Sequence, residues 1–419
     1  LILAGGRVDE LSVLTLHRPK SAVFFGGMYR VIDFPLSNLM NSGIERVGIL
    51  SQYRSTSLIN HVGVGASWDF VGRERGVTLL PPQQGSSHTD WYRGTADAVA
   101  QNREFLEEYP HEHVLIVSGD HIYNMDYQEL VRFHEENDAD VTAAFVPVPG
   151  DDAGRFGLGD IEGEDADPGG PLVDYVEKPK RPLYNWASMT IYLFKRSVLS
   201  EILRNFAPPT GTFEFGRDVL PALIPKFKVF GWKHRGYWAY SRTIDEYWRA
   251  NMDFLDGEGN LGFEKWRLRT NLDDKRLRER SPAILTGESR VTNSRFTFGC
   301  HIAGTVERSI LFPGVVVEAG AVVRDSILFP DARVAAGAEI TKVIADEKVT
   351  IGPGARIGIG NDTRANSVHP DLLRSGITLI GKDTHIPGTV EMGKNCIVPP
   401  FLNEEQFTES SYPAGVLVT

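Results

Sequence analysis

The first residues of the chain combine a short apolar run with paired glycines and nearby cations. The run LILAGG, residues 1–6, reads as a buried strand that ends at Gly5 and Gly6. Glycines at a strand end let backbone N–H groups approach phosphate oxygens without interference from a Cβ atom, although paired glycines are also typical of a tight turn. Arg7 and Lys20 are candidate charge-assisted donors to the same phosphate. This segment therefore indicates a site for a small anionic ligand.

Two alternating patterns predict the elements that position this segment. Apolar, β-branched runs predict buried strands, and amphipathic stretches predict helices. The expected strands are residues 1–3, 47–50, 114–117 and 141–145, and the expected helices are residues 97–108 and 127–136. The alternation implies an α/β domain with a doubly wound, mostly parallel sheet, whose ligands bind at the carboxyl ends of the strands. We expect this Rossmann-like domain to cover residues 1–255, followed by a polar, charge-rich linker at 256–290.

A 17-residue repeat replaces these patterns beyond the linker. The segments VEAGAVV, VAAGAEI and IGPGARI align with Gly320, Gly337 and Gly354 in register. Apolar residues recur at every sixth position, with one slip, and we expect them to point inward: Val316, Val322, Leu328, Val334, Ile340, Ile380, Ile386, Met392 and Val398. A six-residue step corresponds to one strand and one turn on each face of a triangular coil of about 18 residues. Residues 291–419 are therefore predicted to form a left-handed parallel β-helix.

A β-helix of this kind has two uses that a sequence can indicate. Acyltransferases built on this fold catalyse with a histidine at a coil edge, for which His301 and His385 are the candidates inside the coils. Both histidines are more typical of exposed turn residues. We therefore favour a rigid platform for oligomerisation and regulation.

Composition restricts the class of protein. The chain has 419 residues, 42% of them apolar, and 44 Lys and Arg against 55 Asp and Glu, which gives a net charge of −11. This balance disfavours a nucleic-acid partner. There are two cysteines, Cys300 and Cys396, and no apolar run of about 18 residues, so we expect a cytoplasmic protein without a membrane partner. Because Leu1 lies within an expected strand, further native residues are expected before it.

A series of motifs carries a family resemblance across nearly the whole chain. In order they are LILAGGR, FGGMYRVIDFPLSN, SQYRSTSL, LLPPQQ, WYRGTADAV, GDHIYNMDY, YVEKPK, ASMTIYLF, EFGRDVLP and TIDEYWRANMDF. Together they resemble the ADP-glucose pyrophosphorylase (glucose-1-phosphate adenylyltransferase) family. The resemblance implies that ATP and glucose 1-phosphate are converted to ADP-glucose and pyrophosphate for glycogen or starch synthesis. It also implies Mg²⁺ and cationic side chains rather than a covalent intermediate.

The resemblance also assigns site residues. The nucleotide-binding set is Gly5, Gly6, Arg7, Gln83, Gln84, Gly94 and Thr95. The glucose 1-phosphate set is Tyr92, Gly157, Glu177, Lys178 and Ser188, with Lys178 expected on the phosphate. Asp120 matches the Mg²⁺-binding aspartate, although an aspartate after a strand is also typical of a helix cap. Lys20 and Asp120 are the candidate catalytic residues.

Two departures from the family pattern affect the phosphate and metal positions. Where the family loop reads GGRGxRL, this chain has Val8 in place of the third glycine and Glu10 in place of the second arginine. Where the family reads WRDVGT, this chain has Tyr240 in place of the aspartate and Arg242 in place of the glycine. Glu10 places negative charge beside a triphosphate, and a phenol is a poorer Mg²⁺ ligand than a carboxylate. A milder change puts Thr190 in place of a glycine.

These departures predict a subunit that still binds the sugar ligand but transfers poorly. The alternatives are a fully active adenylyltransferase with a re-routed metal site and a purely regulatory or structural subunit. The expected assembly is a homotetramer or a hetero-oligomer with an active homologue.

Overall fold

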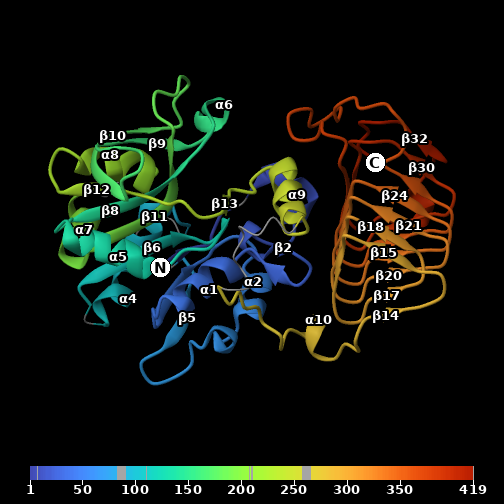
Figure 1. Ribbon diagram of the computed structural model, residues 1–419, viewed down its shortest axis with the longest axis horizontal. Helices are drawn as coiled ribbons and strands as arrows, with labels where there is room; N and C mark the ends of the chain where they lie inside the picture. The colour runs from blue at the N-terminus through green and yellow to red at the C-terminus, as the bar shows by residue number, and fades with distance from the viewer. Residues whose placement is uncertain are drawn as a thin grey trace.

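The protein folds into an α/β domain and a parallel β-helix that lie side by side (Figure 1). The computed structural model describes residues 1–6, 8–82, 91–109, 111–206, 208, 211–256 and 266–418. The sequence-based prediction of these two architectures is confirmed. The first strand of the β-helix, β14 (Ile284–Leu285), already lies within the stretch interpreted as linker.

The α/β domain is built on a nine-stranded sheet in the order β5-β4-β1-β6-β11-β8-β12-β10-β9. Its strands are β1 (Ile2–Leu3), β4 (Arg46–Leu50), β5 (Gly76–Leu80), β6 (His113–Ser118), β8 (Val141–Pro147), β9 (Gly157–Ile161), β10 (Gly169–Glu177), β11 (Trp186–Lys195) and β12 (Val229–Lys233). β11 runs antiparallel to its neighbours β6 and β8, and β10 runs antiparallel to β12 and β9. The other strands share one direction, so the sheet is mostly parallel.

Helices cover both faces of this sheet. They are α1 (Asp33–Asn41), α2 (Thr56–Val62), α3 (Thr95–Gln101), α4 (Arg103–Glu107), α5 (Tyr127–Glu136), α6 (Gly150–Ala153), α7 (Arg196–Asn205), α8 (Leu220–Leu223) and α9 (Ile244–Asp253), followed by α10 (Lys275–Arg278) near the β-helix. Alternate strand residues point to opposite faces, so Val117 packs with α1, α2 and α5, whereas Ile116 packs with α3, α4 and α7. Each helix of the described residues is too short or too polar to cross a membrane.

The single helix predicted at 97–108 is divided at Asn102 into α3 and α4. The Asn102 amide donates hydrogen bonds to the Ala98 carbonyl and to the Tyr92 hydroxyl. Asparagine side chains that bond to nearby backbone compete with helical geometry, which accounts for the interruption. The Tyr92 hydroxyl donates in turn to the Leu80 carbonyl at the end of β5. Asn102 and Tyr92 thereby connect β5, the loop before α3 and α3 itself.

Short parallel strands form the three sheets of the β-helix. The first sheet contains β14, β17 (His301–Ile302), β20 (Val316–Val317), β23 (Arg333–Val334), β26 (Thr350–Ile351) and β29 (His385–Ile386). The second contains β15 (Arg290–Thr292), β18 (Thr305–Glu307), β21 (Val322–Arg324), β24 (Glu339–Thr341), β27 (Arg356–Ile357), β30 (Glu391–Met392) and β32 (Ser411–Tyr412). The third contains β16 (Arg295–Phe296), β19 (Ile310–Leu311), β22 (Ile327–Leu328), β25 (Val343–Ala345), β28 (Thr378–Ile380) and β31 (Ile397–Val398). His301 and His385 lie on strands rather than at turns.

The interior of the β-helix departs from a strict six-residue step. Val317 and Val323 are fully buried, whereas Val316 and Val322, which were expected inside, are only half-buried. The next interior position after Val323 is Leu328, five residues on. A five-residue step on one face explains why Ile310 pairs with Ile327, so that one coil takes 17 residues.

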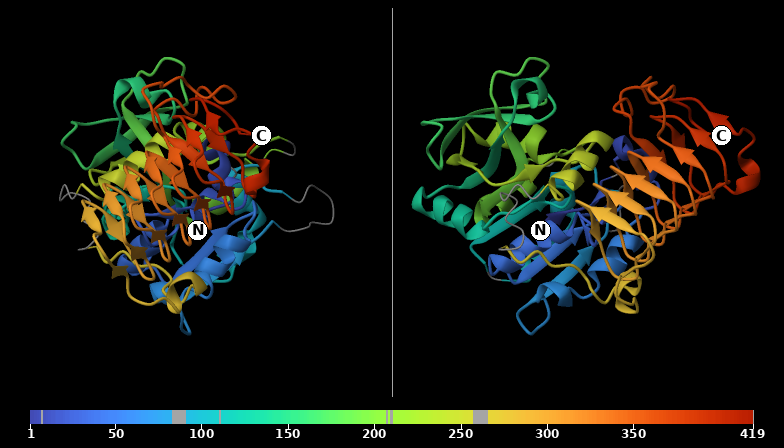
Figure 2. Two further views of the ribbon diagram at one scale, coloured as in Figure 1. Left: turned by 90° about the vertical axis from the view of Figure 1, so that its right-hand side faces the viewer. Right: turned by 45° about the vertical axis from the view of Figure 1, so that its right-hand side comes forward.

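An apolar face of the β-helix packs against the α/β domain. Ile310, Ile327 and Ile344 on its third sheet belong to one buried cluster with Phe24 and Phe25 of the first domain. Phe24 lies on β2 (Phe24–Phe25), which pairs with β3 (Tyr29–Arg30). The two turned views show the stacked coils running alongside this part of the domain (Figure 2). The β-helix is therefore part of the same folded body as the sheet that carries the candidate site.

Candidate functional site

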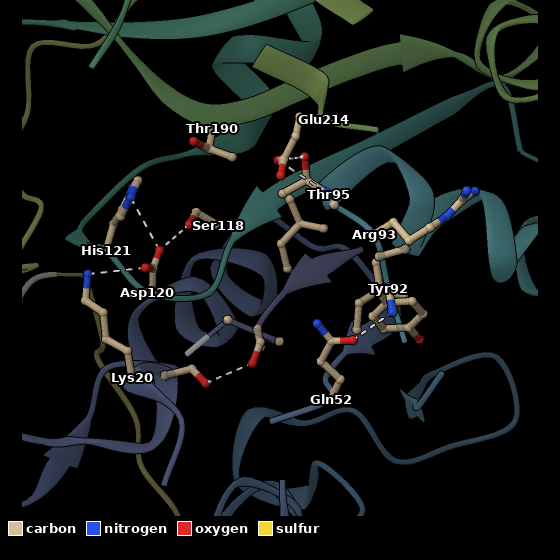
Figure 3. Close-up of a pocket in the computed structure, with 18 of the residues that line it drawn as sticks. Lys20, Gln52, Tyr92, Arg93, Thr95, Ser118, Asp120, His121, Thr190 and Glu214 are labelled. Carbon is tan, nitrogen blue, oxygen red and sulfur yellow. Dashed lines mark hydrogen bonds and ion pairs between the residues drawn. The ribbon is translucent and has the colours of Figure 1, made fainter. Parts of the chain in front are cut away.

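A cavity of about 490 Å³ opens at the carboxyl ends of three parallel strands. Gly5 and Gly6 follow β1, Gln52 follows β4, and Asp120 follows β6. Parallel strands place these positions at one edge of the sheet, where open α/β sheets bind ligands. In Figure 3, Lys20, Ser118, Asp120 and His121 lie on one side of the cavity and Gln52, Tyr92 and Arg93 on the other. We call this the nucleotide cavity.

Lys20 and Asp120 form a partly buried ion pair on the first side. Lys20 Nζ lies 3.3 Å from Asp120 Oδ2, and the Lys20 side chain is 2% exposed. The Ser118 hydroxyl donates to Asp120 Oδ1, and His121 Nε2 lies 3.4 Å from the same oxygen. Burial alone would raise the pKa of Asp120, but Lys20 and the Ser118 hydrogen bond outweigh it and hold that pKa well below its usual range. Asp120 is therefore an ionised carboxylate that already has partners.

The opposite side is built from the loop before α3 and the start of that helix. The Tyr92 backbone N–H donates to Gln52 Oε1 over 2.8 Å, and the Tyr92 hydroxyl donates to the Leu80 carbonyl. Gly94 has φ +146°, and a Cβ there would lie 2.3 Å from the Phe213 carbonyl oxygen. Thr95 Oγ1 donates to Glu214 Oε2 over 3.1 Å. Only glycine at position 94 allows the loop before α3 to approach the Phe213 carbonyl this closely.

A second cavity, of about 360 Å³, adjoins the first. Four of the five residues assigned to glucose 1-phosphate line it: Gly157, Glu177, Lys178 and Ser188. A Cβ at Gly157 would lie 1.8 Å from the Tyr175 hydroxyl, which donates to Glu177 Oε2 over 2.8 Å. The Lys178 side chain is 53% exposed, and its ammonium lies 3.7 Å from Glu177 Oε1. We call this the sugar cavity.

The two cavities share a wall formed by Thr95, Thr190, Glu214 and Tyr240. Thr190 has φ +54°, a left-handed conformation that is unusual for a β-branched residue. It lies where β11 changes register against β8, between Ser188 and Tyr192. Backbone strain of this kind persists where the surrounding structure imposes it, often at functional sites. A ligand that spans both cavities has to pass this wall.

The two departures from the family pattern contact each other. Arg242 Nε donates to Glu10 Oε1 over 2.9 Å, and Arg242 Nη1 donates to the Tyr240 hydroxyl over 3.0 Å. Glu10 lies in the 3₁₀ turn η1 (Asp9–Thr15), whereas Tyr240 follows β13 (Trp238–Ala239). The Tyr240 ring stacks on Trp238, and burial, with the charge of Asp120, raises the pKa of Tyr240. Tyr240 is therefore a neutral phenol at the shared wall.

The side chains at this position do not fit an Mg²⁺ site. Mg²⁺ prefers oxygen ligands in octahedral geometry, with carboxylates supplying its protein contacts. Asp120 is held by Lys20 and Ser118, and a neutral phenol stands where the resemblance expects the second carboxylate. Within the described ranges, no group of three or more His, Cys, Asp or Glu side chains is arranged to hold a metal ion.

The structure brings most of the predicted site residues together. Gly5, Gly6, Lys20, Gly94, Thr95 and Asp120 line the nucleotide cavity, while Arg7, Gln83 and Gln84 lie outside the described residues. Tyr92, which the resemblance assigns to glucose 1-phosphate, lines the nucleotide cavity, where the Gln52 and Asn102 bonds hold it.

Sequence reasoning missed Gln52, His121 and Glu214 as cavity residues, together with Arg155 and Arg217 of the sugar cavity. Gln52 could have been found, because it follows a predicted buried strand. The position of Glu214 depends on its bond to Thr95, 119 residues earlier in the chain, and no local pattern indicates that bond.

Comparisons with known proteins agree with this architecture. The family model "Nucleotidyl transferase" matches residues 1–257, and the model "GlmU-like, C-terminal hexapeptide" matches residues 285–380. The glucose-1-phosphate adenylyltransferase of Thermomicrobium roseum is 44% identical over 441 residues, which cover 100% of this chain and 96% of the relative. Those of Acetivibrio thermocellus and Thermotoga maritima are 38% and 39% identical, over 97% and 99% of this chain and 94% and 97% of each relative. The hexapeptide match agrees with a left-handed β-helix.

Proposed function

This chain belongs to the glucose-1-phosphate adenylyltransferase family, and we propose that it is a subunit that binds the family's nucleotide and sugar ligands while its own adenylyl transfer is impaired. The observation that carries this proposal is the contact of Arg242 with both Glu10 and Tyr240. It joins the departure at the phosphate loop, Glu10, to the departure at the metal position, Tyr240. The ligands of this subunit are ATP, glucose 1-phosphate and ADP-glucose.

Retention of the sugar cavity supports the binding part of the proposal. Gly157, Glu177, Lys178 and Ser188 come from three different strands or strand ends and still line one cavity. The shared wall places this cavity next to the nucleotide cavity. A nucleotide sugar, with nucleoside and sugar at opposite ends of a diphosphate, matches two cavities that meet at one wall.

The charge around Glu10 supports the impairment. An arginine at this position would add a fixed donor to a phosphate oxygen in the transition state, and loss of one such donor typically costs about 3 to 4 kcal/mol. Glu10 instead presents a carboxylate, and its acceptor oxygen is occupied by Arg242. In the free protein Arg242 donates in turn to Glu10 and to the Tyr240 hydroxyl. Adenylyl transfer therefore lacks a phosphate donor at Glu10 and a carboxylate metal ligand at Tyr240.

We further propose that the subunit acts in the cytoplasm in glycogen or starch synthesis, as a homotetramer or as a hetero-oligomer with an active homologue. The full-length similarity to adenylyltransferases supports the pathway. Among the described residues, β14, β15 and β16 are the outermost strands of the three sheets at one end of the β-helix, and a symmetric assembly would cover such edges.

The test is the pyrophosphorolysis of ADP-glucose by the purified chain with Mg²⁺. The Thermomicrobium roseum relative, measured in parallel, is the positive control. We expect turnover several orders of magnitude below that of the relative, with retained binding of ADP-glucose. Equal turnover would contradict the impairment and favour the alternative, a fully active adenylyltransferase with a re-routed metal site. A third measurement, on a mixture with an active homologue, tests the regulatory role through a change in the homologue's rate.

A further inference from the structure

The shared wall of the two cavities is where a nucleotide sugar would place its diphosphate. Its nucleoside would occupy the nucleotide cavity and its hexose the sugar cavity, so the two phosphates between them pass Tyr240 and Thr190. In a site of this kind the charge of a diphosphate is commonly neutralised by a divalent cation. The chain does not build a carboxylate set for that cation, because Asp120 is already paired and Tyr240 offers a neutral hydroxyl.

Fixed cations flank Tyr240 instead. Lys20 Nζ donates to the Tyr240 carbonyl over 2.6 Å and lies 4.9 Å from the centre of the Tyr240 ring. Arg242 Nη1 donates to the Tyr240 hydroxyl over 3.0 Å. Tyr240, which lines both cavities, thus contacts both an ammonium and a guanidinium.

The Tyr240 hydroxyl still has a proton to donate. It accepts its hydrogen bond from Arg242, and within the described residues no acceptor for its own O–H hydrogen is found. A hydroxyl polarised by a guanidinium is a good donor to a phosphate oxygen. The rings of Trp238, His121 and Phe156 surround the Tyr240 ring and fix its direction.

Glu10 is the residue that would compete with a phosphate for Arg242. Glu10 and Arg242 are each 34% exposed, so the carboxylate can turn to solvent when a phosphate competes for the guanidinium. In the free protein Glu10 balances Arg242, and Asp120 balances Lys20. Glu10 is therefore a competitor of the ligand, and its removal would favour binding.

We propose that this site binds the diphosphate of a nucleotide sugar without a divalent cation, with the Tyr240 hydroxyl as donor and with Lys20 and Arg242 supplying the positive charge. The inference rests on the proposed function, because it takes ADP-glucose as the ligand. It goes further in assigning the charge neutralisation to the chain's own side chains. It also identifies Tyr240 as a binding residue rather than a lost metal ligand.

The experiment is titration calorimetry of ADP-glucose into the full-length chain, once in EDTA and once in excess Mg²⁺. We expect dissociation constants within about threefold of each other in the two buffers. Tyr240→Phe keeps the ring stack and removes the donor, and it should weaken binding about tenfold or more in both buffers. Glu10→Gln should tighten binding, and Arg242→Gln should weaken it. Adenosine, which lacks the diphosphate, is the control ligand and should bind all variants equally.

The outcomes separate the two proposals. Binding of ADP-glucose that is at least tenfold tighter with Mg²⁺ overturns this inference and leaves the proposed function standing. Binding in neither buffer overturns the proposed function and the inference with it. Unchanged affinity in Tyr240→Phe also overturns the inference. If Tyr240→Phe fails to fold, as judged by its circular dichroism spectrum, the one-third exposed Arg242→Gln provides the same test.

Discussion

Restoring the family residues at Glu10 and Tyr240 should raise adenylyl transfer, and the structure shows that a third change is required. Glu10→Arg alone would put a guanidinium where Arg242 Nε now lies 2.9 Å from a carboxylate oxygen. Two like charges on side chains that are one-third exposed repel by about 1 kcal/mol at most, the scale of an exposed ion pair. We therefore expect Glu10→Arg to lower stability and leave the rate at background. The productive variant combines Glu10→Arg and Tyr240→Asp with Arg242→Gly.

The size of the gain follows from the two repaired positions. A fixed donor to developing phosphate charge is typically worth about 3 to 4 kcal/mol, or about 10²- to 10³-fold in rate. The aspartate would lie on the same side of the cavity as Lys20 and Asp120 and complete a pair of carboxylates for Mg²⁺. Since both changes act on the same phosphates, their effects need not add. We expect an increase of several orders of magnitude for the triple variant.

The assay is pyrophosphate-dependent formation of ATP from ADP-glucose, measured for the wild type, the triple variant and Glu10→Gln/Arg242→Gln. The last variant removes the ion pair without adding a donor. The pair is one-third exposed on both sides, so its loss should cost at most about 1 kcal/mol of stability and should not restore the rate. A triple variant that is folded, binds ADP-glucose and still shows background turnover would refute the reasoning. A wild type as fast as its relatives would refute it as well.

Three further predictions concern the sugar cavity, the β-helix and a buried histidine. Lys178→Ala should weaken glucose 1-phosphate binding by about tenfold to a hundredfold with little change for ATP, as measured by calorimetry, because a charge-assisted contact is worth about 1.5 to 3 kcal/mol; equal affinities would show that the sugar cavity no longer functions. Removal of residues 281–419 should yield an aggregating chain of altered oligomeric state in light scattering, since it uncovers the apolar face around Phe24; a soluble product with the parent's subunit count would contradict this. Burial lowers the pKa of His134 to about 4, so the folded state binds fewer protons than the unfolded state between about pH 4 and 6.5, and stability falls as the pH drops through that window. His134→Gln should flatten this acid decline by up to about 3 kcal/mol in urea unfolding, and parallel pH profiles would disprove it.

Much of the fold could be predicted because burial leaves a periodic pattern. The runs at β1, β4, β6 and β8 are apolar on both sides, as strands buried between two helical layers must be. The register of the β-helix was harder, since Ile310, Ile327 and Ile344 are also apolar although they face outward onto the first domain. Hydrophobicity alone does not distinguish a core inside the coils from an interface outside them. Val316 and Val322 each precede a second valine, the buried Val317 and Val323, and hydrophobicity does not show which valine of each pair points inward.

The candidate site, like the fold, could be predicted from the sequence only in part. Glycines and charged residues at strand ends could be assigned to one sheet edge, because the topology of parallel strands brings those ends together. The contact of Glu10 with Arg242 could not be predicted, since the two are 232 residues apart and each is unfavourable when considered alone. As a pair they neutralise each other. The substitutions therefore read as a connected change rather than as two independent losses.

The segment that carries Lys20 is tied to the β-helix as well as to the site. Arg18, 2% exposed, binds both carboxylate oxygens of Asp346 and one oxygen of Glu347, and these acids follow β25 of the β-helix. Breaking a buried pair of this kind is strongly destabilising, because it leaves an uncompensated charge. Lys20 stands two residues from Arg18, whereas the sugar cavity is built mainly on β9, β10 and β11. A displacement of the β-helix relative to the sheet would therefore reach Lys20 and the phosphate side of the site before it reached the sugar side.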